Sequence, residues 1–178
     1  MPKLVKLVSS QSATSCFIDG RKRVSIAIGT PDERIHKLRE NGSCHWRLIG
    51  CDGNDLLSIE LLRKSGRLFG VDLIVFTGDI LTTGIDYTPS GVEPGIPEFE
   101  MADWCDKPTG PNFQDFRKPF SVHAHPSAIQ IQILPANLET SWSTMGGRLF
   151  LGFTKCRSLA SITTTGVSER ELSVFLGK

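Results

Sequence analysis

Residues 56–69 read LLSIELLRKSGRLF, and this stretch decides the fold class that the sequence predicts. Seven of its residues are apolar and recur at helical spacing: Leu56, Leu57, Ile59, Leu61, Leu62, Leu68 and Phe69. Apolar side chains three and four positions apart form one face of an amphipathic helix. We therefore predict the main helix of the protein here, weakened at its end by Gly66 and Gly70.

Strands are predicted on both sides of this helix, at residues 44–49 and 71–77. Residues 129–133 alternate between Ile and Gln, so one face of a further strand is buried, and residues 149–153 are its natural antiparallel partner. Strands and helices do not alternate as βαβ units. The predicted fold class is therefore α+β, with an antiparallel sheet packed against one main helix plus short helices. The expected core consists of Leu57, Leu61, Val75, Ile129, Ile131, Ile133, Leu149 and Leu151.

Local turn and cap signals fix three further elements. Asp19-Gly20 between two apolar runs predicts a tight β-hairpin. Thr30-Pro31-Asp32-Glu33 is a capping box, which predicts a short helix that ends at Gly42. A second capping box, Ser168 to Glu171, predicts a short helix near residue 178.

The domain organisation follows from length and from the distribution of Pro and Gly. A chain of 178 residues is one ordinary domain, or one domain with an arm. We predict a flexible basic arm at residues 1–15 and a single domain at residues 16–178. Within it, residues 78–119 are rich in Pro, Gly and acids and are expected to form one long loop.

Composition excludes two classes of protein. With 39% hydrophobic and 22% charged residues, the chain is too apolar for disorder and too polar for a membrane-spanning bundle. No apolar run approaches the ~20 residues that a membrane-spanning helix needs. The five cysteines are odd in number and irregular in spacing, which indicates reduced thiols in a cytosolic setting.

Charge is segregated along the chain. Residues 1–70 have a net charge of +5, residues 71–115 of −8 and residues 116–178 of +4. Five bases near the N-terminus are expected to contact an anionic surface of lipid or nucleic acid: Lys3, Lys6, Arg21, Lys22 and Arg23. The alternative interpretation is a solvated hairpin tip.

The long loop is the predicted self-association segment. It combines eight of the 19 acids with five apolar side chains, namely Ile80, Leu81, Ile85, Tyr87 and Ile96. Such a mixture can dock on a basic surface of a second copy, and a head-to-tail contact that does not close gives an open filament or lattice. The alternative is that the loop packs on its own domain.

The sequence holds no recognisable catalytic signature. It has no GxSxG elbow and no phosphate-binding loop. His123 and His125 have usable metal-ligand spacing, and Cys44 or His45 are conceivable third ligands, but the sequence places no third ligand beside them. We predict no catalytic residue, no metal site and no cofactor, and the protein is not expected to be an enzyme.

The order of the predicted elements resembles that of rhabdovirus matrix proteins, in particular the short plant-infecting type. The similarity spans about residues 40–157 as an order of elements. At residue level it consists of Phe-Arg-Lys-Pro-Phe at 116–120 and the alternating strand at 128–134. The chain lacks the PPxY and PTAP late motifs, and Tyr87-Thr88-Pro89-Ser90 is not one, so recruitment of budding machinery by that route is not implied.

The resemblance implies a structural protein that self-associates, condenses the viral nucleocapsid and links it to the inner face of the envelope during assembly and budding. It places the protein in the virion, the host cytoplasm and at host membranes, as a peripheral protein that does not span them. Two alternatives stay open: a small RNA-binding protein such as a viral silencing suppressor, and a metal-dependent enzyme.

Overall fold

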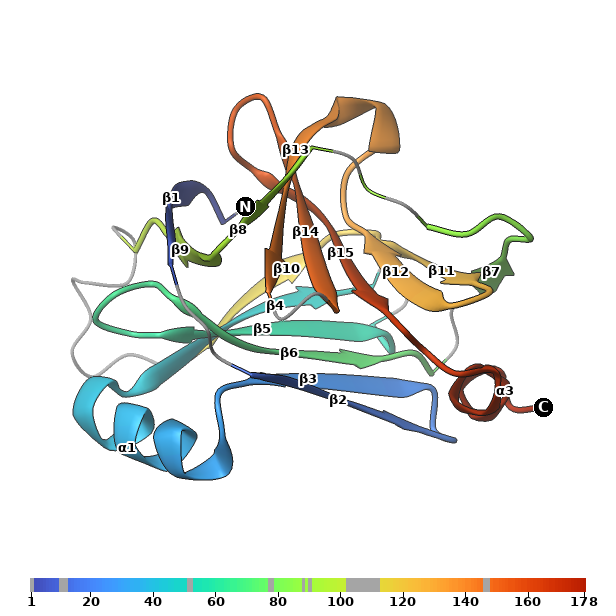
Figure 1. Cartoon of the computed structure of the whole chain (residues 1–178), viewed down its shortest axis with the longest axis horizontal. Coiled ribbons are helices and arrows are strands. Elements are labelled where there is room, and N and C mark those ends of the chain that lie inside the picture. The colour runs from blue at the N-terminus through green and yellow to red at the C-terminus, as the bar shows by residue number, and fades with distance from the viewer. Residues whose placement is uncertain are drawn as a thin grey trace.

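The protein is a sandwich of two large β-sheets, not the α+β fold that the sequence predicts (Figure 1). The computed structural model describes residues 2–9, 13–50, 53–76, 79–87, 89, 91–101, 113–145 and 148–178. These residues form a six-stranded sheet, a seven-stranded sheet and a two-stranded ribbon. The core lies between the two large sheets, because their strands direct one set of alternating side chains inward.

The six-stranded sheet has the order β10-β4-β5-β6-β3-β2. Its strands are β2 (Thr14–Asp19), β3 (Arg23–Ile28), β4 (Ser43–Ile49), β5 (Leu56–Leu62), β6 (Leu68–Ile74) and β10 (Phe113–Arg117). All neighbours are antiparallel except β10 and β4, which are parallel.

The seven-stranded sheet has the order β7-β11-β12-β15-β14-β13-β8. Its strands are β7 (Ile80–Thr82), β8 (Val92–Pro94), β11 (Ser121–His125), β12 (Ala128–Gln132), β13 (Glu139–Met145), β14 (Leu149–Thr154) and β15 (Leu159–Thr165). The two short outer strands, β7 and β8, are parallel to their neighbours.

The remaining elements lie around the sandwich. They are β1 (Leu4–Val8) and β9 (Ile96–Phe99), which pair with each other, the helices α1 (Pro31–Asn41) and α3 (Glu169–Leu176), and a single 3₁₀ turn, η1 (Ala136–Leu138). Both α-helices begin at the predicted capping boxes, with Thr30 and Ser168 as N-caps. Asp19-Gly20 lies in the β2–β3 hairpin, so these three local predictions are confirmed.

The predicted main helix at residues 56–69 is wrong, because the stretch forms β5, a tight turn and β6. Leu57, Ile59 and Leu61 point into the core at a period of two, and Ser58 and Glu60 alternate with them on the outer face. Apolar residues also occur at the flanking outer positions 56 and 62, and they extend the pattern so that it fits helical spacing as well.

Two glycines, one at the turn after β5 and one within β6, favour the strand pair over a helix. Gly66 has φ +68°, and a Cβ there would collide with the carbonyl oxygen of Phe99. Gly70 lies under the side chains of Arg34 and Glu60, where a Cβ would lie 3.0 Å from Glu60 Oε2. A turn with positive φ and a close approach over the sheet both favour glycine, so these residues belong to a hairpin rather than to a frayed helix end.

Three further expectations are corrected by the pairing of strands. β12 and β14 are not partners, because β15 lies between them and pairs with both. The N-terminal arm is not free, since residues 4–8 form β1, and β2 begins at Thr14. The long loop at 78–119 contains β7, β8, β9 and β10. All eight predicted core residues are buried, so the core prediction is confirmed although the predicted fold class is not.

The position of Ile59 gives a direct test of the strand assignment. Its side chain is fully buried between the sheets, so Ile59→Ala should lower the free energy of unfolding by about 2–5 kcal/mol. Ile35 on α1 is 51% exposed, and Ile35→Ala should change stability by less than about 0.5 kcal/mol. Equilibrium denaturation of both variants measures the difference, and equal effects would contradict the sandwich core.

Candidate functional site

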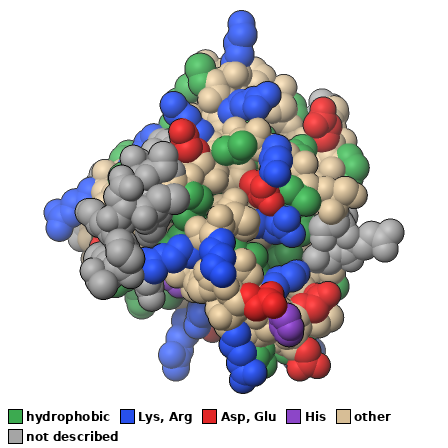
Figure 2. All heavy atoms as spheres, turned by 90° about the vertical axis from the view of Figure 1, so that its left-hand side faces the viewer, with side chains coloured by type: hydrophobic (Ala, Val, Ile, Leu, Met, Phe, Trp, Pro, Cys, Tyr) green, Lys and Arg blue, Asp and Glu red, His purple; other side chains and the backbone are tan. Residues whose placement is uncertain are grey.

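Lys and Arg side chains are spread over one end of the sandwich, with some acidic side chains among them (Figure 2). Seven Lys and Arg residues from three segments of the chain belong to it: Lys3, Lys6, Arg63, Lys64, Arg67, Lys155 and Arg157. We call this surface the basic end face. These three segments carry no acid, and the acids on or next to the neighbouring strands are Glu93 of β8, Glu98 of β9 and Glu100, which follows β9.

Backbone contacts hold these segments together. Lys3 forms a β-bridge with Ser158, and Leu4 N–H donates to the carbonyl of Arg157 at 2.8 Å. Arg67 forms a second bridge with Glu98 of β9, which is the partner strand of β1. The β1 strand, the β5–β6 turn and the β14–β15 turn therefore meet at one end of the molecule although they are far apart in the sequence.

Glu98 is the buried acid at the centre of the basic end face. Its carboxylate lies 3.2 Å from Lys6 Nζ and 2.9 Å from Arg67 Nη2, so it joins β1 to the start of β6. Burial raises the pKa of Glu98, but the hydrogen bonds and charges of Arg67 and Lys6 together outweigh it, and the net pKa lies below the ordinary value of 4.5. The carboxylate stays ionised and sets the positions of two of the seven bases.

A cleft of about 460 Å³ opens beside this centre, between β1 and β13. Lys6, Trp142 and Arg157 are among the residues that line it. Arg157 has φ +60°, a conformation that non-glycine residues rarely adopt, and its Nη1 donates to the carbonyl of Val5 at 3.2 Å. The strained turn thus presents a guanidinium, which is a good ligand for phosphate oxygens, at the mouth of the cleft.

A second basic surface lies at the tip of the β2–β3 hairpin. Arg21 is exposed, Lys22 has φ +52°, and Arg23 pairs with Asp72 at 3.0 Å. Two apolar side chains are near this tip. Phe76 is 65% exposed, and it follows Val75, whose N–H donates to the carbonyl of Lys22. Val174 of α3 lies beside Gly20. We call this surface the hairpin end.

The five predicted anion-binding bases therefore do not form one surface. Lys3 and Lys6 belong to the basic end face, and Arg21, Lys22 and Arg23 belong to the hairpin end. In Figure 1, β1 lies at the left and α3, which contacts the hairpin tip, lies at the right of the longest axis. The sequence did not indicate that Arg63, Lys64, Arg67, Lys155 and Arg157 join Lys3 and Lys6.

The structure divides the five predicted self-association residues between buried and exposed positions. Ile96 is buried on β9, Ile80 packs against the core, and the Tyr87 ring lies 5.6 Å from the ring of His125. Leu81 and Ile85 are exposed, Ile85 to 78%. Leu81 and Ile85 are therefore the most accessible of the five to a second copy of the chain, Ile80 and Tyr87 are half-buried, and Ile96 is not accessible.

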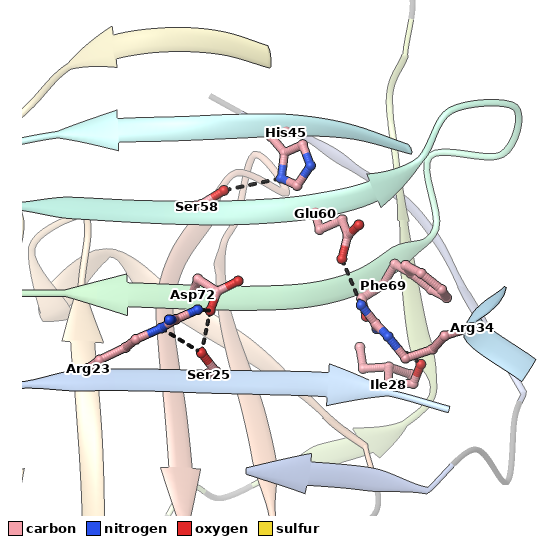
Figure 3. A network of polar contacts seen from close by, with 9 residues as sticks. All are labelled: Arg23, Ser25, Ile28, Arg34, His45, Ser58, Glu60, Phe69 and Asp72. Carbon is pink, nitrogen blue, oxygen red and sulfur yellow. Dashed lines mark hydrogen bonds and ion pairs between the residues drawn. The ribbon is translucent and has the colours of Figure 1, made fainter. Parts of the chain in front are cut away.

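A polar network covers the outer face of the six-stranded sheet (Figure 3). Arg34 of α1 reaches over Gly70, pairs with Glu60 at 2.9 Å and stacks on the ring of Phe69 at 4.1 Å. Asp72 accepts hydrogen bonds from Ser25 and Arg23 on the adjacent strand. Each charge in this network has a partner of opposite sign, so the network links α1, β3, β5 and β6 and leaves little net charge for a ligand.

The histidines and cysteines do not converge on a site. His123 contacts Ser121, and His125 contacts Thr83, Ile85 and Gln130. Burial, and to a smaller extent the charge of His125, lower the pKa of His123. Cys44 lies on β4 with its thiol buried, which raises its pKa to about 11, and His45 contacts Ser58. Among the residues that the structure describes, no three His, Cys, Asp or Glu side chains are grouped so that they could hold a metal ion.

No protein-family model matches the sequence, and a search of curated proteins finds no relative. In the described ranges, no helix combines the length and the apolar character needed to cross a membrane. The two basic surfaces are therefore the features on which a functional assignment depends.

The Glu98 ion pairs predict a pH-dependent loss of stability. A carboxyl whose pKa is lowered by folding stabilises the folded state above its ordinary value of 4.5, and this contribution disappears as the pH falls through the lowered value. Glu98→Gln should therefore lower the free energy of unfolding by about 1–3 kcal/mol at pH 7, and by progressively less below pH 4.5. Urea unfolding across this range measures the difference, and a cost that does not change with pH would show that the ionised carboxylate is unimportant.

Proposed function

We propose that this protein is a structural protein of the matrix type, which links a nucleocapsid to an anionic membrane through the two ends of its sandwich. The single observation that supports this proposal is the placement of two basic surfaces at opposite ends of the longest axis. A molecule of this shape can contact two polyanionic partners at once, whereas one continuous basic surface would hold only one of them.

The hairpin end is assigned to the membrane because it combines cations with exposed apolar side chains. Arg21 and Lys22 can contact anionic headgroups, while Phe76 and Val174 are available to enter the interfacial layer. Membrane-surface proteins use this combination, since apolar burial and electrostatic attraction add to each other.

The basic end face is assigned to the nucleocapsid because its chemistry is that of phosphate contact without base stacking. Its seven bases lie on turns and in or next to β1, where the exposed large apolar side chain is Val5, and the aromatic side chain beside them, Trp142, is half-buried in the cleft. Lys and Arg that contact phosphates provide affinity that does not depend on nucleotide sequence. Stacking on single-stranded bases requires exposed aromatic rings, so this face favours an anionic assembly over a specific RNA sequence.

This proposal depends on the surfaces more than on the resemblance to rhabdovirus matrix proteins. The main helix at 56–69 was one member of the order of elements that carried the resemblance, and β5 and β6 replace it. The strand at 128–134 exists as β12, and residues 116–120 lead into β11. Self-association, condensation of the nucleocapsid and a place in the virion and at host membranes follow from the resemblance and are part of the proposal.

A sequence-independent RNA-binding protein is the second candidate, and the cleft beside Arg157 favours it. Lys6 and Arg157 could hold a phosphate there while Trp142 contacts a base. This function requires the basic end face alone and gives no role to Phe76 at the hairpin end.

Two double charge reversals of equal size separate the two ends. Arg21→Glu with Lys22→Glu should weaken sedimentation with phosphatidylserine vesicles by at least about tenfold, since each base near an anionic membrane contributes about 1 kcal/mol. Lys3→Glu with Lys64→Glu should leave vesicle binding within about threefold of the parent. The same variant should lower the slope of log affinity against log salt concentration, for binding to a nonspecific RNA, by about one or two. Vesicle sedimentation and a salt titration of RNA binding measure these effects.

Each double reversal is the control for the other, because both change two exposed or half-exposed side chains by the same charge. If the two variants lose vesicle and RNA binding equally, then the protein has one diffuse basic surface and the two-ended assignment is wrong. The other outcome is that neither variant loses vesicle binding and only Lys3→Glu with Lys64→Glu weakens RNA binding. In that case the RNA-binding candidate replaces the matrix-type proposal.

A further inference from the structure

The outermost strand of the six-stranded sheet is β2; its outer edge pairs with no strand that the structure describes, and α3 lies against part of the strand. It pairs with β3 on one side, and in the order of the sheet no strand of the described chain follows it on the other (Figure 1). Because β2 comprises six residues, this edge is long enough to accept another strand.

The direction of the unpaired backbone groups can be derived from one hydrogen bond. Gly29 N–H donates to the carbonyl of Ala13 at 2.8 Å, immediately before the first residue of β2. Backbone groups alternate between the two sides of an antiparallel strand. The N–H and C=O groups of Thr14, Cys16 and Ile18 therefore point away from β3, toward the outer edge.

The other edges of the two large sheets carry features that prevent further pairing, and residues 14–18 of β2, before the terminal Asp19, do not. β7 and β8 have three residues each, and β8 ends in Pro94. β10 carries Asp115 and Arg117, and Asp115 forms a double hydrogen bond with Arg47. Short length, proline and charge are the usual protections of an edge strand. Residues 14–18 of β2 contain no charged residue and no proline.

The outer face of β2 also exposes an aromatic ring. Phe17 is 62% exposed and lies opposite Ser25 on β3. Ser15 and Phe17 point to the same face because side chains alternate along a strand. A strand added at this edge would cover part of the Phe17 ring, so the site offers apolar contact as well as backbone hydrogen bonds.

We infer that the edge of β2 binds the β2 edge of a second copy of this chain in an antiparallel arrangement, which joins two six-stranded sheets into one. Charge selects the orientation. In a parallel pair the two Arg21-Lys22-Arg23 tips would lie side by side and repel each other. In an antiparallel pair the tips lie at opposite ends of the strand, about 20 Å apart for six residues.

The outward-pointing groups fix the register as well. An antiparallel pair that uses all three outward residues places Cys16 opposite Cys16 of the second copy and Thr14 opposite Ile18. Ser15 of one copy then lies directly opposite Phe17 of the other. The contact is isologous, so it produces a closed dimer. It does not depend on the proposed function, and it uses a surface other than the loop residues Leu81 and Ile85.

Light scattering coupled to size-exclusion chromatography over a concentration series tests this dimer. The parent chain should shift from monomer to dimer as its concentration rises. Phe17→Lys, and independently Ser15→Lys, should remain monomeric, because each places a charge on the edge and next to its counterpart in the second copy. Ile35→Lys is the matched control, since Ile35 is an exposed apolar residue on α1, and it should dimerise as the parent does.

The register is tested by mixing the variants Ser15→Cys and Phe17→Cys under mild oxidation. Peptide mass spectrometry of the mixture should find a disulfide between position 15 of one copy and position 17 of the other. This product should be more abundant than the disulfide between two copies of position 15 or between two copies of position 17. A parent that stays monomeric at every concentration would overturn the inference. Dimers that persist in both lysine variants, or an assembly larger than a dimer that these variants do not affect, would also overturn it.

Discussion

The burial of alternating apolar side chains between two antiparallel sheets is the constraint on which the rest of this structure depends. Leu57, Ile59 and Leu151 occupy inner positions and are fully buried, so every neighbouring position on the same strands faces outward. On the outer face of the six-stranded sheet, Asp72 pairs with Arg23 and Arg34 pairs with Glu60, whereas most bases of the two basic surfaces lie on turns at the two ends. A two-ended distribution of charge is thus a consequence of the sandwich itself.

The basic end face shows how one buried acid can organise a cationic surface. Glu98 is ionised, pairs with Lys6 and Arg67, and connects β1, β9 and the start of β6. Its partners neutralise it, while Lys64 and Arg157 on the adjacent turns keep their charge for an external anion. The positive φ of Arg157 is consistent with this role, because a turn selected for stability alone would favour glycine at that position.

Local signals in the sequence predicted local structure well, and long-range pairing was where prediction failed. The capping boxes at Thr30 and Ser168 and the Asp19-Gly20 turn are determined by neighbouring residues, and the structure confirms all three. Residues 56–69 fit both a helical and an alternating pattern, and only the packing of β5 against β4 and β6 selects the strand. The basic end face joins turns that lie far apart in the sequence, so composition and spacing could show part of it only.

The central claim is that one molecule holds two anionic partners at its two ends, and recruitment of RNA to vesicles tests it most directly. A labelled nonspecific RNA should sediment with phosphatidylserine vesicles only when the protein is present. This bridging should be lost when either end is reversed, by Arg21→Glu with Lys22→Glu or by Lys3→Glu with Lys64→Glu. Competition between RNA and vesicles for the protein, with no RNA recruited, would contradict the claim, since it would mean that both partners use the same surface.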